Sequence, residues 1–239
     1  MKQAPLALLL VLLITFSAFA QKKQSDREFE GFRGPVKMVT EESAELKQTG
    51  STEIEAAREP RKLLTFDADG NLVSDKVYLR GEEFDIRVYS FIDGERVVKH
   101  DVLTKNVLKL SAPGKPGSKP GDPRYSAKIK YEYDSKGNRT EMAWLDPDGR
   151  PYLRYVYKQE GNSKEVTVYR SDGSFSHGYK EKLDDKGNEL ETTSASPNRR
   201  SSPKTTYTYL EFDSQGNWIK RKVSRGDSSS ISYRTITYH

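Results

Sequence analysis

The chain has 239 residues, of which 34% are hydrophobic and 31% charged, and its formal net charge is +5. It contains no cysteine, which excludes disulfides, thiolate chemistry and lipid attachment through a cysteine. Its basic residues are interleaved with acidic ones rather than clustered, so the composition argues against a nucleic-acid partner.

The first twenty residues carry the pattern of a cleaved export signal. Lys2 supplies a positive charge, residues 7–16 form an apolar run, and Ala18 and Ala20 make a small-x-small site before Gln21. The run is shorter than the ~20 apolar residues that a bilayer span needs, so we expect no transmembrane anchor. We predict a signal peptide over residues 1–20, cleavage between Ala20 and Gln21, and a periplasmic or secreted protein.

Two β regions follow the export signal. Residues 21–110 and 124–239 consist mostly of segments that alternate polar and apolar side chains with the period of a strand. Residues 36–46, which follow Gly34-Pro35, are expected to form a strand. Between the regions, residues 111–123 are rich in Pro and Gly and cannot join a central strand, so they form either a long loop or a linker between two sheets.

A repeated turn signature joins these strands. An aromatic residue or Leu is followed by Asp, two variable residues, Gly and usually Asn. Asp bonds the backbone just ahead of it and Gly takes the left-handed conformation, which together close a short hairpin. We therefore predict an all-β fold, an antiparallel meander of repeat hairpins that forms an extended, curved sheet or two abutting sheets. The turn residues are Asp67, Gly70, Asp134, Gly137, Asp146, Gly149, Asp184, Gly187, Asp213 and Gly216.

The turn signature resembles the YD repeat of RHS-type proteins, whose core is Tyr-Asp-x-x-Gly-Asn followed by a strand. Residues 133–139 and 212–220 match that core most closely. The units here are irregularly spaced and no toxin domain follows them. The resemblance thus implies a short exported form with degenerate repeats, and it implies no catalytic residues.

The sequence offers no local catalytic, metal or cofactor site. The three histidines, His100, His177 and His239, lack the spacing of a zinc site. A calcium loop needs Gly at position six and Glu at position twelve, whereas counting from Asp67 puts Gly at position four and Tyr78 at position twelve. Weak calcium binding by the Asp-rich turns in another geometry stays open. We predict no cofactor.

Aromatic side chains on the predicted strands are the remaining candidates for a ligand-binding face. Such side chains stack on sugar rings or peptide side chains, but they also form the core of sheet proteins, which is the commoner use. The six candidates are Trp144, Tyr155, Tyr157, Tyr207, Tyr209 and Trp218.

These features predict an exported, non-enzymatic binding or assembly module of the cell envelope. An open sheet exposes a face and two edges, which would recruit an envelope protein, a polysaccharide or a second copy of the chain. Two alternatives stay open. An envelope glycan hydrolase would show a carboxylate pair from separate strands in a deep cleft, and a carrier of a lipid or small ligand would show an apolar cavity.

Overall fold

The computed structural model describes residues 22–102, 126–146, 148–197 and 203–239, so the predicted signal peptide and the Pro/Gly-rich segment lie outside the described residues. The described part contains a short helix and fifteen strands, and none of its helices is long and apolar enough to span a membrane. In chain order they are α1 Asp26–Phe29, β1 Val36–Thr49, β2 Thr52–Glu55, β3 Glu59–Phe66, β4 Leu72–Leu79, β5 Glu82–Ile92, β6 Glu95–Val102, β7 Ser126–Tyr133, β8 Arg139–Leu145, β9 Pro151–Glu160, β10 Ser163–Arg170, β11 Phe175–Leu183, β12 Glu189–Ala195, β13 Thr205–Phe212, β14 Trp218–Arg225 and β15 Ser228–Tyr238.

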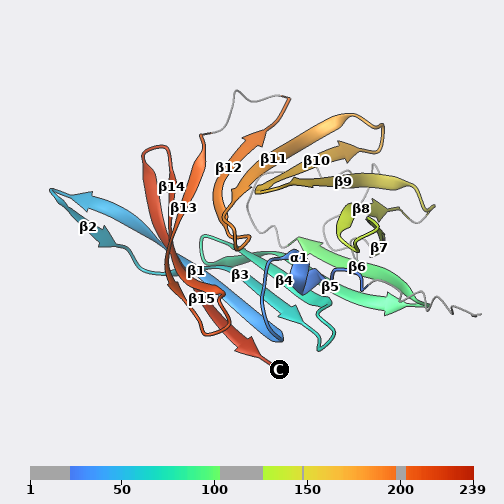
Figure 1. Ribbon diagram of the computed structural model, residues 1–239, viewed down its shortest axis with the longest axis horizontal. Helices are drawn as coiled ribbons and strands as arrows, with labels where there is room; N and C mark the ends of the chain where they lie inside the picture. The colour runs from blue at the N-terminus through green and yellow to red at the C-terminus, as the bar shows by residue number, and fades with distance from the viewer. Residues whose placement is uncertain (1–21, 103–125, 147, 198–202) are drawn as a thin grey trace, which may run out of the picture.

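The sheet closes into an antiparallel barrel. Each strand from β3 to β15 pairs with the next, and β15 then pairs with β1, where Glu41 lies opposite Arg234. β1 also pairs with β3, while the short β2 pairs with β1 alone, so fourteen of the fifteen strands form the wall. Figure 1 shows these strands as a ring around α1.

The structure confirms the all-β antiparallel prediction and the strand expected at residues 36–46. The expected open, curved sheet or pair of abutting sheets is wrong. Alternation along a strand tells which side chains share a face, but it does not tell whether the first and last strands meet. Here they pair over nine residue pairs, which removes the exposed edges of the main sheet.

The barrel is too wide for its own side chains to fill. A barrel of about eight strands is filled by its inward side chains, and larger ones leave a lumen. In this chain two buried apolar clusters occupy parts of the interior. One comprises Phe32, Val36, Val39, Leu64 and Phe66, and the other comprises Val98, Ala127, Ile129 and Trp144.

All four complete Asp-x-x-Gly-Asn turns lie at one end of the barrel. Because a meander reverses at every turn, the turns after β3, β7, β11 and β13 share one rim with the start of β1 and the end of β15. We call this end the anchor rim. The variant turn at Asp146, which follows β8, lies on the opposite rim.

The anchor-rim turns share one hydrogen-bond pattern. In each, the Asp carboxylate accepts the backbone N–H of the Asn four residues later, at 2.7–2.8 Å, and the Gly has a φ of 81–87°. Hydrogen bonds from the side chain and backbone of Asn138 lower the pKa of Asp134. The carboxylates of these turns thus act as acceptors for their own backbone, as the turn chemistry requires.

Candidate functional site

The segment before β1 crosses the anchor rim and closes part of it. We call residues 22–35, which include α1, the strap. The N–H of Gln24 donates to Gly137 O and the N–H of Arg27 donates to Gly70 O, both at 2.9 Å. The Arg33 guanidinium donates to the carbonyl oxygens of Gly216 and Lys186. The strap therefore contacts all four complete turns of the anchor rim.

Asn217 binds the strap most directly. Its Oδ1 accepts the backbone N–H of Arg33 at 2.8 Å, and its Nδ2 donates to Arg33 O at 2.9 Å and to the Tyr238 hydroxyl at 2.9 Å. In the other three turns, the Asn side chain donates back to the Asp of its own turn. Asn217 is only 4% exposed, so its hydrogen bonds are shielded from water.

Substituting Asn217 with Ala is expected to lower the free energy of unfolding by about 2 kcal/mol, because three shielded hydrogen bonds are lost. The matched control is Asn138→Ala, which removes an exposed side chain that bonds only Asp134, and it should cost less than about 1 kcal/mol. Urea unfolding followed by circular dichroism measures both variants. Equal losses would contradict a special role for Asn217 in holding the strap.

A buried carboxylate fixes the other end of the strap. Asp26, 6% exposed, lies 2.6 Å from Arg96 Nη2 and 2.7 Å from Arg139 Nη2 and accepts the backbone N–H of Leu72 at 2.8 Å. Ser25 caps α1 through a reciprocal capping box with Glu28. Burial and the nearby Asp26 charge raise the pKa of Tyr131. The strap is therefore attached to the barrel wall by charge as well as by the rim turns.

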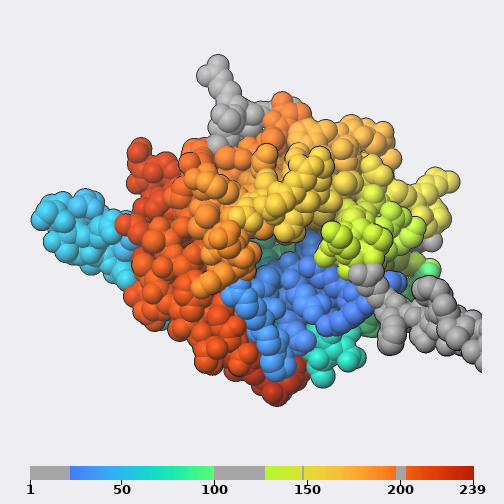
Figure 2. Space-filling model, viewed as in Figure 1, coloured from blue at the N-terminus to red at the C-terminus, as the bar shows by residue number. Residues whose placement is uncertain are grey.

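A large cavity opens beside the strap. Its volume is about 970 Å³, and it lies between the strap and the rim ends of β8 to β12, with β13, β14 and β15 behind. In the space-filling view the strap (blue) is seated between the two sides of the barrel (Figure 2). The aromatic residues that line the large cavity are Phe29, Phe32, Tyr157, Tyr179, Tyr209 and Trp218.

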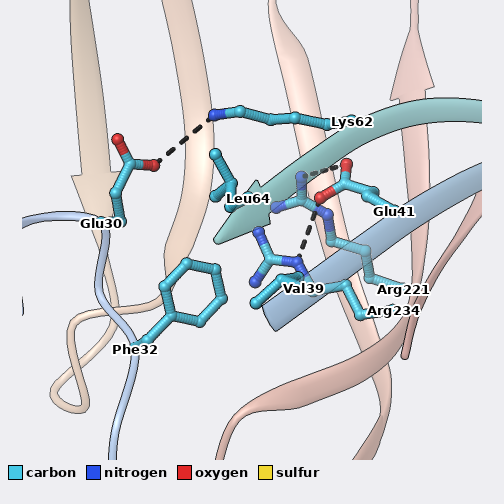
Figure 3. A pocket seen from close by; sticks show the side chains of 8 residues that line it. All are labelled: Glu30, Phe32, Val39, Glu41, Lys62, Leu64, Arg221 and Arg234. Atoms are coloured by element: carbon cyan, nitrogen blue, oxygen red, sulfur yellow. Dashed lines mark hydrogen bonds and ion pairs between the residues drawn. The ribbon is translucent and has the colours of Figure 1, made fainter. Parts of the chain in front are cut away.

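A smaller cavity of about 200 Å³ adjoins the large one, since Glu30, Phe32, Arg221 and Arg234 line both. Figure 3 shows the Glu41 carboxylate paired with both guanidinium groups, 3.0 Å from Arg234 Nε and 4.0 Å from Arg221 Nη2. Glu30 lies 3.7 Å from Lys62 on the same cavity. Charged side chains therefore dominate this part of the interior.

Burial changes the acidity of groups around the large cavity. It raises the pKa values of Tyr157 and Tyr179 further above neutral pH, where phenols are protonated hydrogen-bond donors. Burial also raises the pKa of Glu181, although the ion pair with Lys164 at 3.6 Å acts to lower it. The lining thus offers aromatic faces, hydroxyl donors and charges together.

All six aromatic candidates lie on the inner face of the barrel, but only three of them line the large cavity. Tyr157, Tyr209 and Trp218 line it. Trp144 and Tyr155 belong to the buried apolar cluster around Val98 and Ile129, and Tyr207 packs on Arg221, with the guanidinium carbon 4.4 Å from the ring centroid.

Neither the strap nor the arginines Arg221 and Arg234 could be recognised as part of a site from the sequence. The capping box Ser25-x-x-Glu28 is a local signal for α1, but nothing local says that α1 enters a barrel. The alternation along β14 and β15 places Arg221 and Arg234 on the inner face of the barrel. The sequence alone does not tell which face of a strand is the inner one. Among the described residues, no group of three or more His, Asp or Glu side chains is arranged to hold a metal ion.

No family model and no curated protein matches this chain. Solved structures with a similar fold include a porin-like protein from Bacteroides uniformis, with 11% identity, a TM-score of 0.41, and coverage of 86% of this chain and 99% of that one. A LolA superfamily protein from Nitrosomonas europaea has 9% identity, a TM-score of 0.30 and 90% coverage of both chains. A DUF1329 family protein from Desulfovibrio piger has 12% identity, a TM-score of 0.29, and coverage of 85% of this chain and 86% of that one. With all three TM-scores below 0.5, these likenesses do not define what this chain does.

The predicted kinship with YD-repeat proteins is wrong. No family model supports it, and the hairpins close into a barrel. The Asp-x-x-Gly-Asn signature reports turn chemistry that unrelated hairpins share.

Proposed function

We propose that this chain is an exported carrier that holds a small ligand inside its barrel. The observation that carries the proposal is the cavity of about 970 Å³ between the strap and the wall. Ligand sites are typically concavities of roughly 300–1,000 Å³ with aromatic walls and a few convergent polar groups. Export rests on the signal-peptide pattern of residues 1–20.

The carrier replaces the assembly module as the favoured hypothesis. An assembly module would recruit a partner through open sheet edges. The main sheet has no such edges, because β1 and β15 pair with each other. The cavity is not the purely apolar space expected for a simple lipid carrier, because carboxylates and cationic groups line it with the aromatic rings. We therefore expect a ligand with both an apolar and a polar part.

The test uses the neutral fluorescent amphiphile N-phenylnaphthylamine, titrated into the mature chain. We expect saturable binding that weakens about tenfold in Tyr179→Ala, because one aromatic contact is worth up to about 1.5 kcal/mol. The control is Tyr169→Ala. Tyr169 of β10 lies against Arg154 of β9, on the face of the strand opposite to that of the buried Val168. It should leave the affinity unchanged.

Absence of saturable binding in the unaltered chain, or equal loss in both tyrosine variants, would contradict the carrier hypothesis. Native mass spectrometry of the chain purified from its own cell envelope gives an independent readout. A bound small molecule lost in Tyr179→Ala would support the proposal.

A further inference from the structure

We infer that the ligand of this carrier has an anionic group and that Arg221 and Arg234 bind it where the two cavities meet. The inference rests on the proposed carrier function and adds the chemical class of the ligand: an amphipathic carboxylate, sulfate, sulfonate or phosphate. Four observations support it: the position of the two arginines, the incompletely used donors of Arg221, the charge of the lining and the aromatic wall.

The two guanidinium groups are held together over one indole. The guanidinium carbon of Arg221 lies 4.1 Å from the Trp218 ring centroid, and that of Arg234 lies 3.6 Å from it. Both residues come from adjacent strands, β14 and β15, and both line the large and the small cavity. Stacking on the ring holds the planar groups in place, which pre-organises them for an acceptor.

The hydrogen-bonding capacity of Arg221 is incompletely used. Arg221 Nε is buried and has no hydrogen-bond partner among the described residues. The carboxylates nearest its terminal nitrogens are Glu189 at 3.7 Å and Glu41 at 4.0 Å, both beyond hydrogen-bond distance. A guanidinium has five N–H donors, and buried donors normally find partners. An anionic oxygen in the cavity would be a hydrogen-bond acceptor for the terminal N–H groups of Arg221.

The lining has an excess of positive charge. Eight Arg and Lys residues and five Asp and Glu residues line the large cavity. The small cavity is lined by three cationic and two acidic residues. Burial lowers the pKa of Arg234, despite its contact with Glu41 at 3.0 Å. A low-dielectric site with more cationic than anionic side chains favours an anion.

The rest of the large cavity suits the apolar part of such a ligand. Phe29 of the strap packs edge-on against Tyr157 with ring centroids 4.8 Å apart, and Tyr179 and Tyr209 complete this wall. The smaller cavity, at about 200 Å³, has room for a compact head group next to Lys62 and the two arginines. The arrangement therefore fits an amphiphile better than a free inorganic anion.

The experiment compares anilinonaphthalene sulfonate, an anionic amphiphile, with neutral N-phenylnaphthylamine. The unaltered chain should bind the sulfonate at least tenfold more tightly. In Arg221→Gln the dissociation constant of the sulfonate should rise about 10–100-fold, the loss expected for charged hydrogen bonds, while that of the neutral amphiphile changes less than threefold. The control Arg225→Gln removes an exposed arginine from the same strand and should change neither.

Equal affinity of the unaltered chain for the two amphiphiles would overturn the inference and leave the carrier function standing. This comparison decides the question even if Arg221→Gln does not fold. Binding of neither amphiphile would overturn the carrier function itself. Displacement of the sulfonate by decyl phosphate but not by inorganic phosphate would support an amphipathic ligand, and equally strong displacement by both would overturn that assignment.

Discussion

Replacing Asp26 with Asn is expected to lower the free energy of unfolding by about 3–5 kcal/mol, because the change removes one partner of a buried charge cluster. Asp26 neutralises both Arg96 and Arg139, whose side chains are each 5% exposed. Without the carboxylate, two buried guanidinium groups would lose the counter-ion that the strap supplies. Urea unfolding followed by tryptophan fluorescence measures the loss, since Trp144 and Trp218 are both buried.

The matched control for this prediction is Asp69→Asn, which removes the same charge from an exposed position in a rim turn. It should leave the unfolding midpoint where it is, as surface substitutions usually do. A similarly small effect for Asp26→Asn would mean that the strap is not anchored by this cluster. The strap would then depend on the rim turns alone.

Substituting Gly137 with Ala is expected to cost about 3 kcal/mol and to release the first residues of the strap. A left-handed conformation costs a non-glycine residue about 1–2 kcal/mol, and φ is 82° here. A Cβ at Gly137 would also overlap the backbone carbonyl oxygen of Lys22. Displacing that segment breaks the hydrogen bond from Gln24 N–H to Gly137 O, which is worth about 1 kcal/mol more.

Gly187→Ala separates the two costs, because φ is 81° at Gly187 but no atom lies within 4 Å of a Cβ built there. It should show the conformational cost alone. Amide hydrogen exchange then reports on the strap directly: the Gln24 amide should exchange at least tenfold faster in Gly137→Ala than in Gly187→Ala. The same exchange rate in both variants would show that the strap does not depend on Gly137.

The strap gives the repeated turn motif a role that its chemistry alone does not reveal. The Gly carbonyl of three anchor-rim turns accepts a hydrogen bond from the strap, and the fourth turn offers the carbonyl of Lys186 instead. The Asp side chain accepts the turn's own backbone N–H in each case, which leaves these carbonyls free to accept from the strap. One motif therefore both closes the hairpins and forms the docking points for residues 22–35.

The sequence by itself determined the elements of local structure. Alternation with period two and the Asp-x-x-Gly turns are set by neighbours within about ten residues, so the antiparallel hairpins were predictable. The same alternation grouped the aromatic residues such as Tyr157 and Trp218 on common faces, and the structure puts those faces inside the barrel.

Only the tertiary structure decided that the sheet is closed, that the strap enters it and that a cavity remains. The pairing of Glu41 with Arg234 joins residues 193 positions apart, and the contact of Arg33 with Asn217 spans 184. No local pattern encodes such contacts, because they depend on how the twist of every intervening strand accumulates around the barrel. The cavity is a further consequence of that closure, since its volume is the interior space that neither the wall side chains nor the strap fill.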